Sequence, residues 1–248
     1  MISLKTKSEI EMMKEGGRRL SEVMKETLSE VKPGKAFFQI SQKIEELILE
    51  KGGQPSFKMV PGYHWASCLN VNQGVVHGIP NDYCLKKEDL LSLDIGFFFK
   101  GFHTDMATTL CVSGGKETFL ETGKRALEKA IEAARVGNRV GHLSQAIEKE
   151  LRANGLNPIE VLTGHGVGRK LHEAPHIPCL LWGPIESTPK LEVGMTLAVE
   201  VIYAQGSPEV VLAPDNWTIE TADGKLAGLF EETIVIQPEK PLILTALI

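Results

Sequence analysis

The chain has 248 residues, a length that allows a sizeable hydrophobic core and lies near the upper limit for one α/β domain. Its content of 42% hydrophobic and 24% charged residues is typical of a globular protein and excludes a disordered or fibrous chain. The formal net charge of -5, without a long run of lysine and arginine, argues against nucleic acid as the substrate.

The N-terminal segment, Met1 to Lys5, lacks the apolar core of a signal peptide. No apolar run approaches the roughly 18 residues needed to cross a bilayer. The four cysteines form no C-x-x-C pair, which argues against a disulfide framework or a zinc ribbon. We therefore expect a cytoplasmic protein with reduced thiols and no membrane partner.

Four amphipathic helices are predicted from apolar residues spaced by three and four. The first runs from about residue 8 to 31 and begins at a capping box formed by Ser8 and Glu11. The others are expected at about 39–51, 116–135 and 142–154. Gly52 and Gly155 stand where glycine commonly ends a helix, after the second and the fourth.

Strands are predicted after each pair of helices, at Leu90–Phe99, Phe102–Val112, Met195–Ala204 and Gly228–Ile236. A repeat supports the same division, because six residues between positions 34 and 52 recur at a constant offset of 103 residues, and a seventh, Ile48, is matched by Leu151. We predict a single catalytic domain, 1–248, with similar halves of about 1–112 and 113–248 that share one sheet. Two unrelated helices of similar composition are the alternative explanation of the repeat.

Asp94 and Asp105 lie inside apolar strand sequence, where an unpaired charge is costly to bury. If Lys100-Gly101 forms a two-residue turn, Asp94 lies opposite Ala107. Asp105 then points to the same face one diagonal step away, so both carboxylates reach one ion. An isolated aspartate is more often a turn or capping residue, but two on one face of an apolar hairpin favour a pair of metal ligands.

Two histidines follow in a glycine-rich context. His165 lies in Thr163 to Gly168, where glycines allow close backbone approach, and His172 comes seven residues later. Either histidine alone is more typical of a loop residue than of a ligand. Together with several carboxylates, however, an imidazole suits Mn, Fe, Co or Zn.

Three glutamates are embedded in strand-like apolar sequence: Glu200, Glu231 and Glu232. An edge-strand or solvent-facing position is the alternative to a ligand role for each of them. We favour that alternative for Glu232, because it adjoins Glu231.

In the two-half arrangement, the first half supplies Asp94 and Asp105, and the second supplies His165, Glu200 and Glu231. Four carboxylates and one imidazole suffice to hold two divalent ions and a shared hydrolytic water. Their negative charge also nearly cancels that of the ions, so such a site can be buried. The sequence therefore predicts a dinuclear metallohydrolase.

With these residues in place, the chain resembles the methionine aminopeptidases, specifically the short bacterial type I form within the pita-bread metallopeptidases. The resemblance runs from Ile2–Thr6 through Asn72–Pro80 to the strand of Glu231. It implies an α/β (α+β) pita-bread fold, with two pseudo-symmetric halves sharing a curved antiparallel sheet flanked by helices. It also implies metal-dependent removal of N-terminal methionine from nascent proteins and peptides, by metal-activated hydroxide attack on the first peptide bond.

The resemblance assigns roles residue by residue. The metal ligands are Asp94, Asp105, His165, Glu200 and Glu231, of which Asp105 and Glu231 bridge two divalent ions (Co, Mn, Fe or Zn). The catalytic residues are Glu200 as a proton shuttle, and His77 and His172, which contact the substrate near the scissile bond. The pocket for the methionine thioether is lined by Cys68 and Trp217, although either residue suits an ordinary core as well.

Several positions depart from the family pattern. Val201 follows Glu200 where proline is usual, Glu232 replaces a common histidine, and Leu171 replaces a common aromatic. The stretch 57–67 looks shortened, which leaves Tyr63 and its neighbours His64 and Trp65 without an assignment. None of these departures removes a ligand, but they put the shape of the substrate pocket in doubt.

Two other functions are compatible with the same residues. An Xaa-Pro aminopeptidase or prolidase would share the five ligands, but the first helix starts near residue 8 and leaves no room for the extra N-terminal domain usual in those enzymes. A binding protein that has lost its metals would normally have lost ligands too. The resemblance further implies a monomer and possible docking at the ribosome, where new N-termini emerge.

Overall fold

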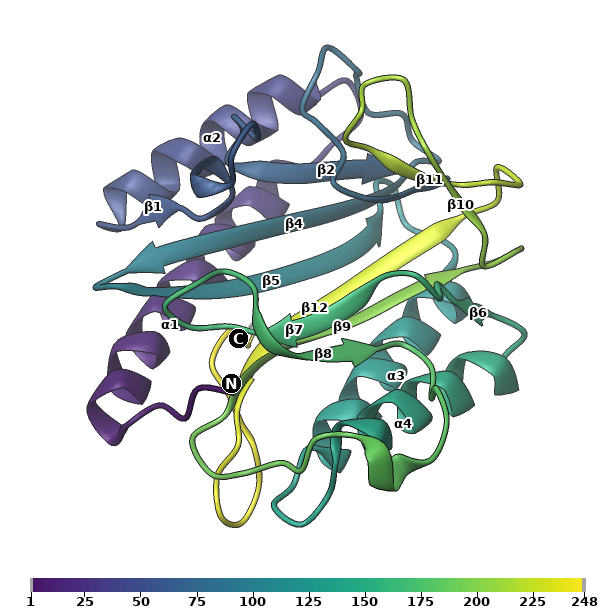
Figure 1. The fold of residues 1–248 in the computed structure, drawn as a ribbon. Coiled ribbons are helices and arrows are strands. Elements are labelled where there is room, and N and C mark those ends of the chain that lie inside the picture. The colour runs from purple at the N-terminus through teal and green to yellow at the C-terminus, as the bar shows by residue number, and fades with distance from the viewer. Residues whose placement is uncertain (1, 247–248) are drawn as a thin grey trace.

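The protein was analysed as a computed structural model that describes residues 2–246. One large curved sheet carries four long helices on a single face, and the two termini of the described chain lie close together (Figure 1). The helices are α1 (Lys7–Glu30), α2 (Phe37–Glu50), α3 (Glu117–Ala133) and α4 (Val140–Ala153). Among residues 2–246, none of the helices combines the length and apolar character needed to span a bilayer.

The large sheet is antiparallel and has ten strands, of which seven form the order β1-β4-β5-β12-β9-β7-β8. β2, β13 and β6 pair alongside β4, β12 and β9, respectively. The strands are β1 (Gln54–Pro55), β2 (Ser67–Val71), β4 (Leu90–Phe99), β5 (Phe102–Cys111), β6 (Asn157–Pro158), β7 (Thr163–Gly166), β8 (Glu173–Pro178), β9 (Thr196–Ala204), β12 (Ala227–Val235) and β13 (Leu242–Ile243). A small second sheet has the order β10-β11-β3, from β3 (Gly74–Val76), β10 (Val210–Leu212) and β11 (Ile219–Thr221).

The two halves of the chain meet where β5 pairs with β12. On one side of this seam, α1 and α2 pack on β4 and β5; on the other, α3 and α4 cover β9 and β12 (Figure 1). Alternate strand residues point into these helix layers and form two apolar cores, as expected for a sheet with one buried and one functional face. The face of the sheet opposite the helices carries the acidic residues near the pairing of β5 with β12.

The hairpin β4–β5 has the predicted register. Lys100 and Gly101 have φ of 48° and 88°, the positive values of a tight turn that matches strand twist. This turn pairs Asp94 with Ala107, as the sequence indicated. The turn at Lys100 and Gly101 therefore determines where Asp94 and Asp105 lie relative to each other.

The helix boundaries agree with the predicted ones to within about two residues, but the predicted capping box is wrong. Thr6 and Glu9, not Ser8 and Glu11, close the start of α1: Thr6 Oγ1 accepts from the Glu9 amide at 3.3 Å, and the Glu9 carboxylate accepts from the Thr6 amide at 2.8 Å. The helix begins earlier because the extended segment before it is held by Lys5, whose amide donates to Gly194 O at 2.8 Å.

Candidate metal centre and substrate pocket

A single row of paired residues across the sheet brings three acids to the same face. Ala107 of β5 pairs with Asp94 of β4 on one side and with Glu231 of β12 on the other. Glu231 in turn pairs with Glu200 of β9. Because directly paired residues of antiparallel strands share a face, all three carboxylates point the same way, and the small Ala107 leaves space between them.

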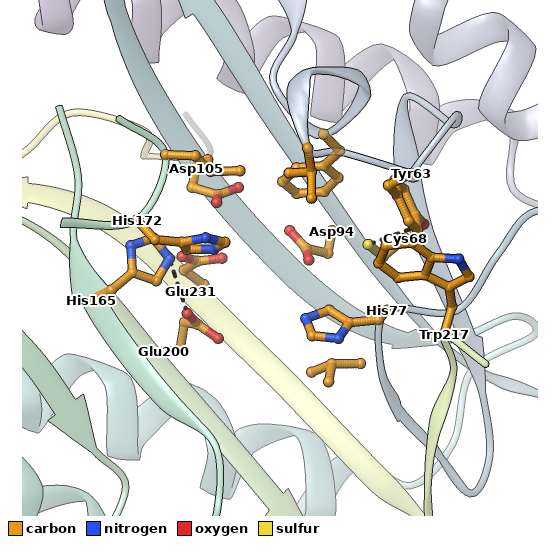
Figure 2. Close-up of a pocket in the computed structure, with 14 residues that line it drawn as sticks. Tyr63, Cys68, His77, Asp94, Asp105, His165, His172, Glu200, Trp217 and Glu231 are labelled. Atoms are coloured by element: carbon orange, nitrogen blue, oxygen red, sulfur yellow. Dashed lines mark hydrogen bonds and ion pairs between the residues drawn. The ribbon is translucent and has the colours of Figure 1, made fainter. Parts of the chain in front are cut away.

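The other two predicted ligands lie in the adjacent row. Asp105 is two residues before Ala107, and His165 of β7 pairs with Ala198, two residues before Glu200. One ligand atom from each of Asp105, His165 and Glu231 lies within 4.8 Å of the others. Figure 2 shows all five side chains converging on one pocket. The structure thus brings together every residue predicted as a metal ligand.

Among residues 2–246, no lysine or arginine forms an ion pair with the carboxylates of this cluster. One buried oxygen each of Asp94, Asp105 and Glu231 has no hydrogen-bond partner among the described residues. Burial raises the pKa of all four carboxyl groups, and the charges of neighbouring acids raise those of Asp105, Glu200 and Glu231 further. Because buried charges are normally paired or coordinate metals, this donor set fits divalent cations.

His165 is oriented for a ligand role. Its Nδ1 lies 2.9 Å from the carbonyl oxygen of Gly166, which can only accept, so Nδ1 carries the proton. Burial lowers the pKa of His165 to about 3, and Nε2 therefore keeps a free lone pair. This nitrogen lies 3.3 Å from a Glu200 oxygen. Two electron-rich atoms at this distance need a cation or a proton between them.

A mostly apolar pocket opens at the acids, which form part of its lining. Cys68 pairs with Asp94 and lies on the same face, while Trp217 forms the outer wall. Both residues predicted for the methionine pocket line it. Phe57, Val60 and Leu171 complete the apolar lining.

Tyr63 is a pocket residue that the sequence left without an assignment. Its hydroxyl lies 2.9 Å from Ser67 O and 3.2 Å from Gly78 O, and its ring packs on Trp217 with centroids 5.1 Å apart. Tyr63 is therefore fixed at both ends and supports the tryptophan. Trp65 packs behind it, outside the pocket lining. An aromatic cluster within a glycine-rich and proline-rich loop was the available signal.

His77 and His172 reach the pocket from different segments. His77 has φ of 60°, and the next residue, Gly78, donates its amide to Asn70 Oδ1 at 2.9 Å. A Cβ at Gly78 would lie 2.1 Å from Leu69 O, so only glycine permits this turn. His172 instead stands beside His165, with ring centroids 4.4 Å apart. Burial lowers the pKa of both His77 and His172, which favours neutral imidazoles.

The segment that carries His172 is tied to the N-terminal strand segment. Lys5 Nζ lies 2.5 Å from Glu173 Oε2, and both side chains are largely buried. Glu173 also accepts from the Lys170 amide at 3.1 Å. Although burial alone would raise it, these hydrogen bonds lower the pKa of Glu173. The ion pair with Lys5 therefore fixes the position of Glu173, the residue that follows His172.

The expectation that Glu232 faces solvent is wrong. It pairs with Met106 and Val199, so its side chain points into the helix layer, where Thr245 Oγ1 donates to it. Burial raises the pKa of Glu232 to about 8. The reason is topological: β12 is an interior strand with helices on one face, so a residue that turns away from the pocket becomes buried. Glu232 takes no part in the acidic cluster.

Comparisons with known proteins agree with this geometry. Residues 11–238 match metallopeptidase family M24. The methionine aminopeptidase of Clostridium perfringens is 39% identical, over 99% of both chains, and methionine aminopeptidase 1 of Bacillus subtilis is 38% identical, over 95% of this chain and 96% of that one.

Solved structures give the same assignment. The crystal structure of methionine aminopeptidase from Thermotoga maritima matches with a TM-score of 0.95 and 36% identity, covering 99% of each chain. Prolidase from Pyrococcus furiosus shares the fold, with a TM-score of 0.79 at 21% identity, and the match covers 65% of that protein. The predicted pita-bread fold and aminopeptidase class are confirmed. The chain therefore belongs to metallopeptidase family M24, among its methionine aminopeptidases.

Proposed function

We propose that this aminopeptidase removes N-terminal methionine from peptides and nascent chains at the pocket in Figure 2, with two divalent ions held by the five-residue cluster. The observation that carries the proposal is the set of buried carboxylate oxygens without a partner on Asp94, Asp105 and Glu231. Two dipositive ions would satisfy these oxygens and offset the negative charge.

The positions of the ligands support a division of labour. Asp94, Asp105, His165, Glu200 and Glu231 would hold the ions, and Asp105 and Glu231 lie between Asp94 on one side and His165 and Glu200 on the other. When bound, divalent ions supply Lewis acidity and an activated water. Mn, Fe, Co and Zn all accept carboxylate and imidazole ligands, and they are the candidates for the physiological metal.

The remaining polar residues would handle protons and orient the peptide. Glu200 would be the proton shuttle, because its carboxyl group lies beside His165 in the pocket. His172 would donate a hydrogen bond to the developing oxyanion, and His77 would contact the scissile amide nitrogen. Both histidines are neutral and can donate one proton each.

The apolar wall is suited to a methionine side chain. A thioether packs well against aromatic rings and a thiol, which Tyr63, Trp217 and Cys68 provide. This combination favours methionine over a charged or strongly polar first residue, which would be buried there without a partner. Cleavage before proline is the alternative specificity within the same fold family.

An activity assay separates the candidates. Purified protein reconstituted with Mn, Fe, Co or Zn is incubated with Met-Gly-Met-Met and with an Ala-Pro peptide, and an Asp105→Ala variant serves as control. Methionine release that the substitution abolishes supports the proposal. Cleavage before proline would assign a prolidase-like specificity, and no release with any metal would favour a binding module.

The family resemblance also leads us to propose a monomer that acts in the cytoplasm beside the ribosome. Sedimentation velocity tests the oligomeric state, and co-sedimentation with ribosomes tests docking. A stable dimer, or a failure to co-sediment at low salt, would contradict these two predictions, respectively.

A further inference from the structure

His103 is a buried histidine that the functional site does not use. It lies at the start of β5, two residues before Asp105 and on the same face, with 4% of its surface exposed. It is not among the residues that line the pocket. A buried polar ring outside the pocket needs a structural or positioning reason.

The ring of His103 binds the loop that forms one wall of the pocket. Its Nδ1 lies 2.9 Å from Ser56 Oγ, in the loop that continues to the wall residue Phe57. Ser56 is fully buried, and no other described side chain bonds to its hydroxyl. Losing this bond would therefore leave a buried hydroxyl unsatisfied.

The same loop packs closely against the β4–β5 hairpin, which carries Asp94 and Asp105. The Ser56 amide donates to Gly96 O at 3.0 Å. A Cβ at Gly96 would lie 2.7 Å from Ser56 Cβ and 2.9 Å from Phe57 Cε1. Because Gly96 has no side chain, the loop can pack closely against it. The hydrogen bond between His103 and Ser56 fixes the loop in this position.

The backbone of His103 is anchored to the opposite wall. Its amide donates to Gly168 O at 2.7 Å, in the segment between His165 and the wall residues Leu171 and His172. His103 thus contacts both segments that flank the pocket. Its side chain holds one segment, and its main chain is bonded to the other.

We propose that His103 is a positioning residue: through its hydrogen bond to Ser56 it holds Phe57, Val60 and Tyr63 at a fixed distance from the metal cluster. This sets the width of the slot that receives the methionine side chain. The inference rests on the proposed function of the pocket and extends it to the residue pair that determines substrate fit.

Four variants test this role. Ser56→Ala and His103→Leu remove the hydrogen bond, while His103→Asn keeps a hydrogen-bonding atom near the position of Nδ1. Ser92→Ala is the matched control, because it breaks a buried 2.8 Å bond to Thr109 in the same hairpin, away from the pocket wall. The readouts are kcat and KM for methionine release from Met-Gly-Met-Met and for leucine release from Leu-Gly-Met-Met, together with Mn stoichiometry by calorimetry.

We expect Ser56→Ala and His103→Leu to raise KM for the methionine peptide about tenfold, the effect of losing one buried hydrogen bond, with kcat changed by less than about twofold. Preference for methionine over leucine should fall in both variants. His103→Asn should restore most of the wild-type KM, and Ser92→Ala should leave KM and preference unchanged. Manganese stoichiometry should be the same throughout.

The inference is overturned if Ser56→Ala folds and keeps the wild-type KM and preference, or if Ser92→Ala changes them equally. It is also overturned if the His103 variants lose metal, because His103 would then act on the metal centre. Should His103→Leu fail to fold, Ser56→Ala decides alone. A wild-type protein that releases no methionine overturns the proposed function, and this inference with it; unaffected variants of an active wild type overturn only the inference.

Discussion

Two of the regions that bury acids in this molecule stabilise them in opposite ways. On the helix layer, Glu150 of α4 is buried but bound by Lys129 and by Arg125, whose Nε lies 3.0 Å away. The hydrogen bond from Lys129 is the main reason that the pKa of Glu150 is lowered. In the pocket, Asp105 and Glu231 are as buried as Glu150, and no lysine or arginine lies among the lining residues that the structure describes.

On the helix layer, where a stable fold is the only need, the chain supplies two cations to the buried Glu150. In the pocket it leaves the buried acids unpaired, at a cost to the stability of the metal-free protein. Unpaired buried acids can be kept at this cost where a bound metal ion supplies the positive charge. The predictions below test this contrast from the largest expected effect to the smallest.

Removing a pocket acid should abolish activity without weakening the fold. We expect Asp105→Asn to lower kcat/KM for Met-Gly-Met-Met by at least about a thousandfold, because the variant would lose one of the proposed metal ligands. The chelator-treated variant should unfold in urea at the same concentration as the wild type or a higher one, because an unpaired buried acid has been neutralised. A variant that keeps activity, or whose metal-free form is clearly less stable, would break the comparison.

Metal should stabilise the wild type and have little effect on this variant. A ligand that binds only the native state at about a thousand times its Kd adds about 4 kcal/mol. We therefore expect EDTA to lower the unfolding temperature of the wild type markedly and that of Asp105→Asn only slightly. Differential scanning calorimetry with and without excess Mn measures both. Equal shifts in the two proteins would place the stabilising metal elsewhere.

The ion pair of Lys5 and Glu173 should show the behaviour of an internally paired acid. Lys5→Met leaves the Glu173 carboxylate buried without its cation, and we expect a loss of about 3 kcal/mol in unfolding free energy. The double variant Lys5→Met, Glu173→Gln should recover part of the loss, since no charge is then stranded. Urea denaturation at neutral pH measures both. A single variant as stable as the wild type would show that the pair contributes nothing.

Glu150→Gln should have the smallest effect, about 1 kcal/mol at neutral pH, since Lys129 and Arg125 are partly exposed and solvent screens the pair. Because the pKa of Glu150 is lowered in the folded state, its stabilisation is present above the ordinary glutamate value of 4.5 and is lost as pH falls below it. The stability difference from wild type should therefore shrink in acid, with methionine release unchanged. A difference that grows as pH falls would contradict the assignment.

The acidic cluster could be predicted because strand register and side-chain alternation in the sheet determine its geometry. The Lys100-Gly101 turn sets the register of Asp94 and Asp105, and strand alternation places Glu231 on the same face. The same alternation turns Glu232 away from the cluster. It did not reveal that the other face at this point is covered by helices, and so the environment of Glu232 was mispredicted.

The pocket wall was less predictable because its contacts join distant segments without any periodic pattern. Tyr63 and Phe57 occupy a loop whose position depends on Ser56, His103 and Gly96. The predicted capping box was wrong for a related reason. A second candidate, Thr6 and Glu9, lies two residues before Ser8 and Glu11, and the contact of Lys5 with Glu173 favours the earlier helix start. Sequence patterns identify such candidates, but tertiary contacts choose among them.

The most direct test of the metal-centre assignment is a calorimetric titration of metal-free protein with Mn, for the wild type and for Asp105→Ala. Binding should release protons at neutral pH, because the folded acids have raised pKa values and must ionise to coordinate. We predict two ions per wild-type chain and weakened or lost binding in the variant. Unchanged binding after loss of Asp105, or no binding by the wild type, would contradict the account.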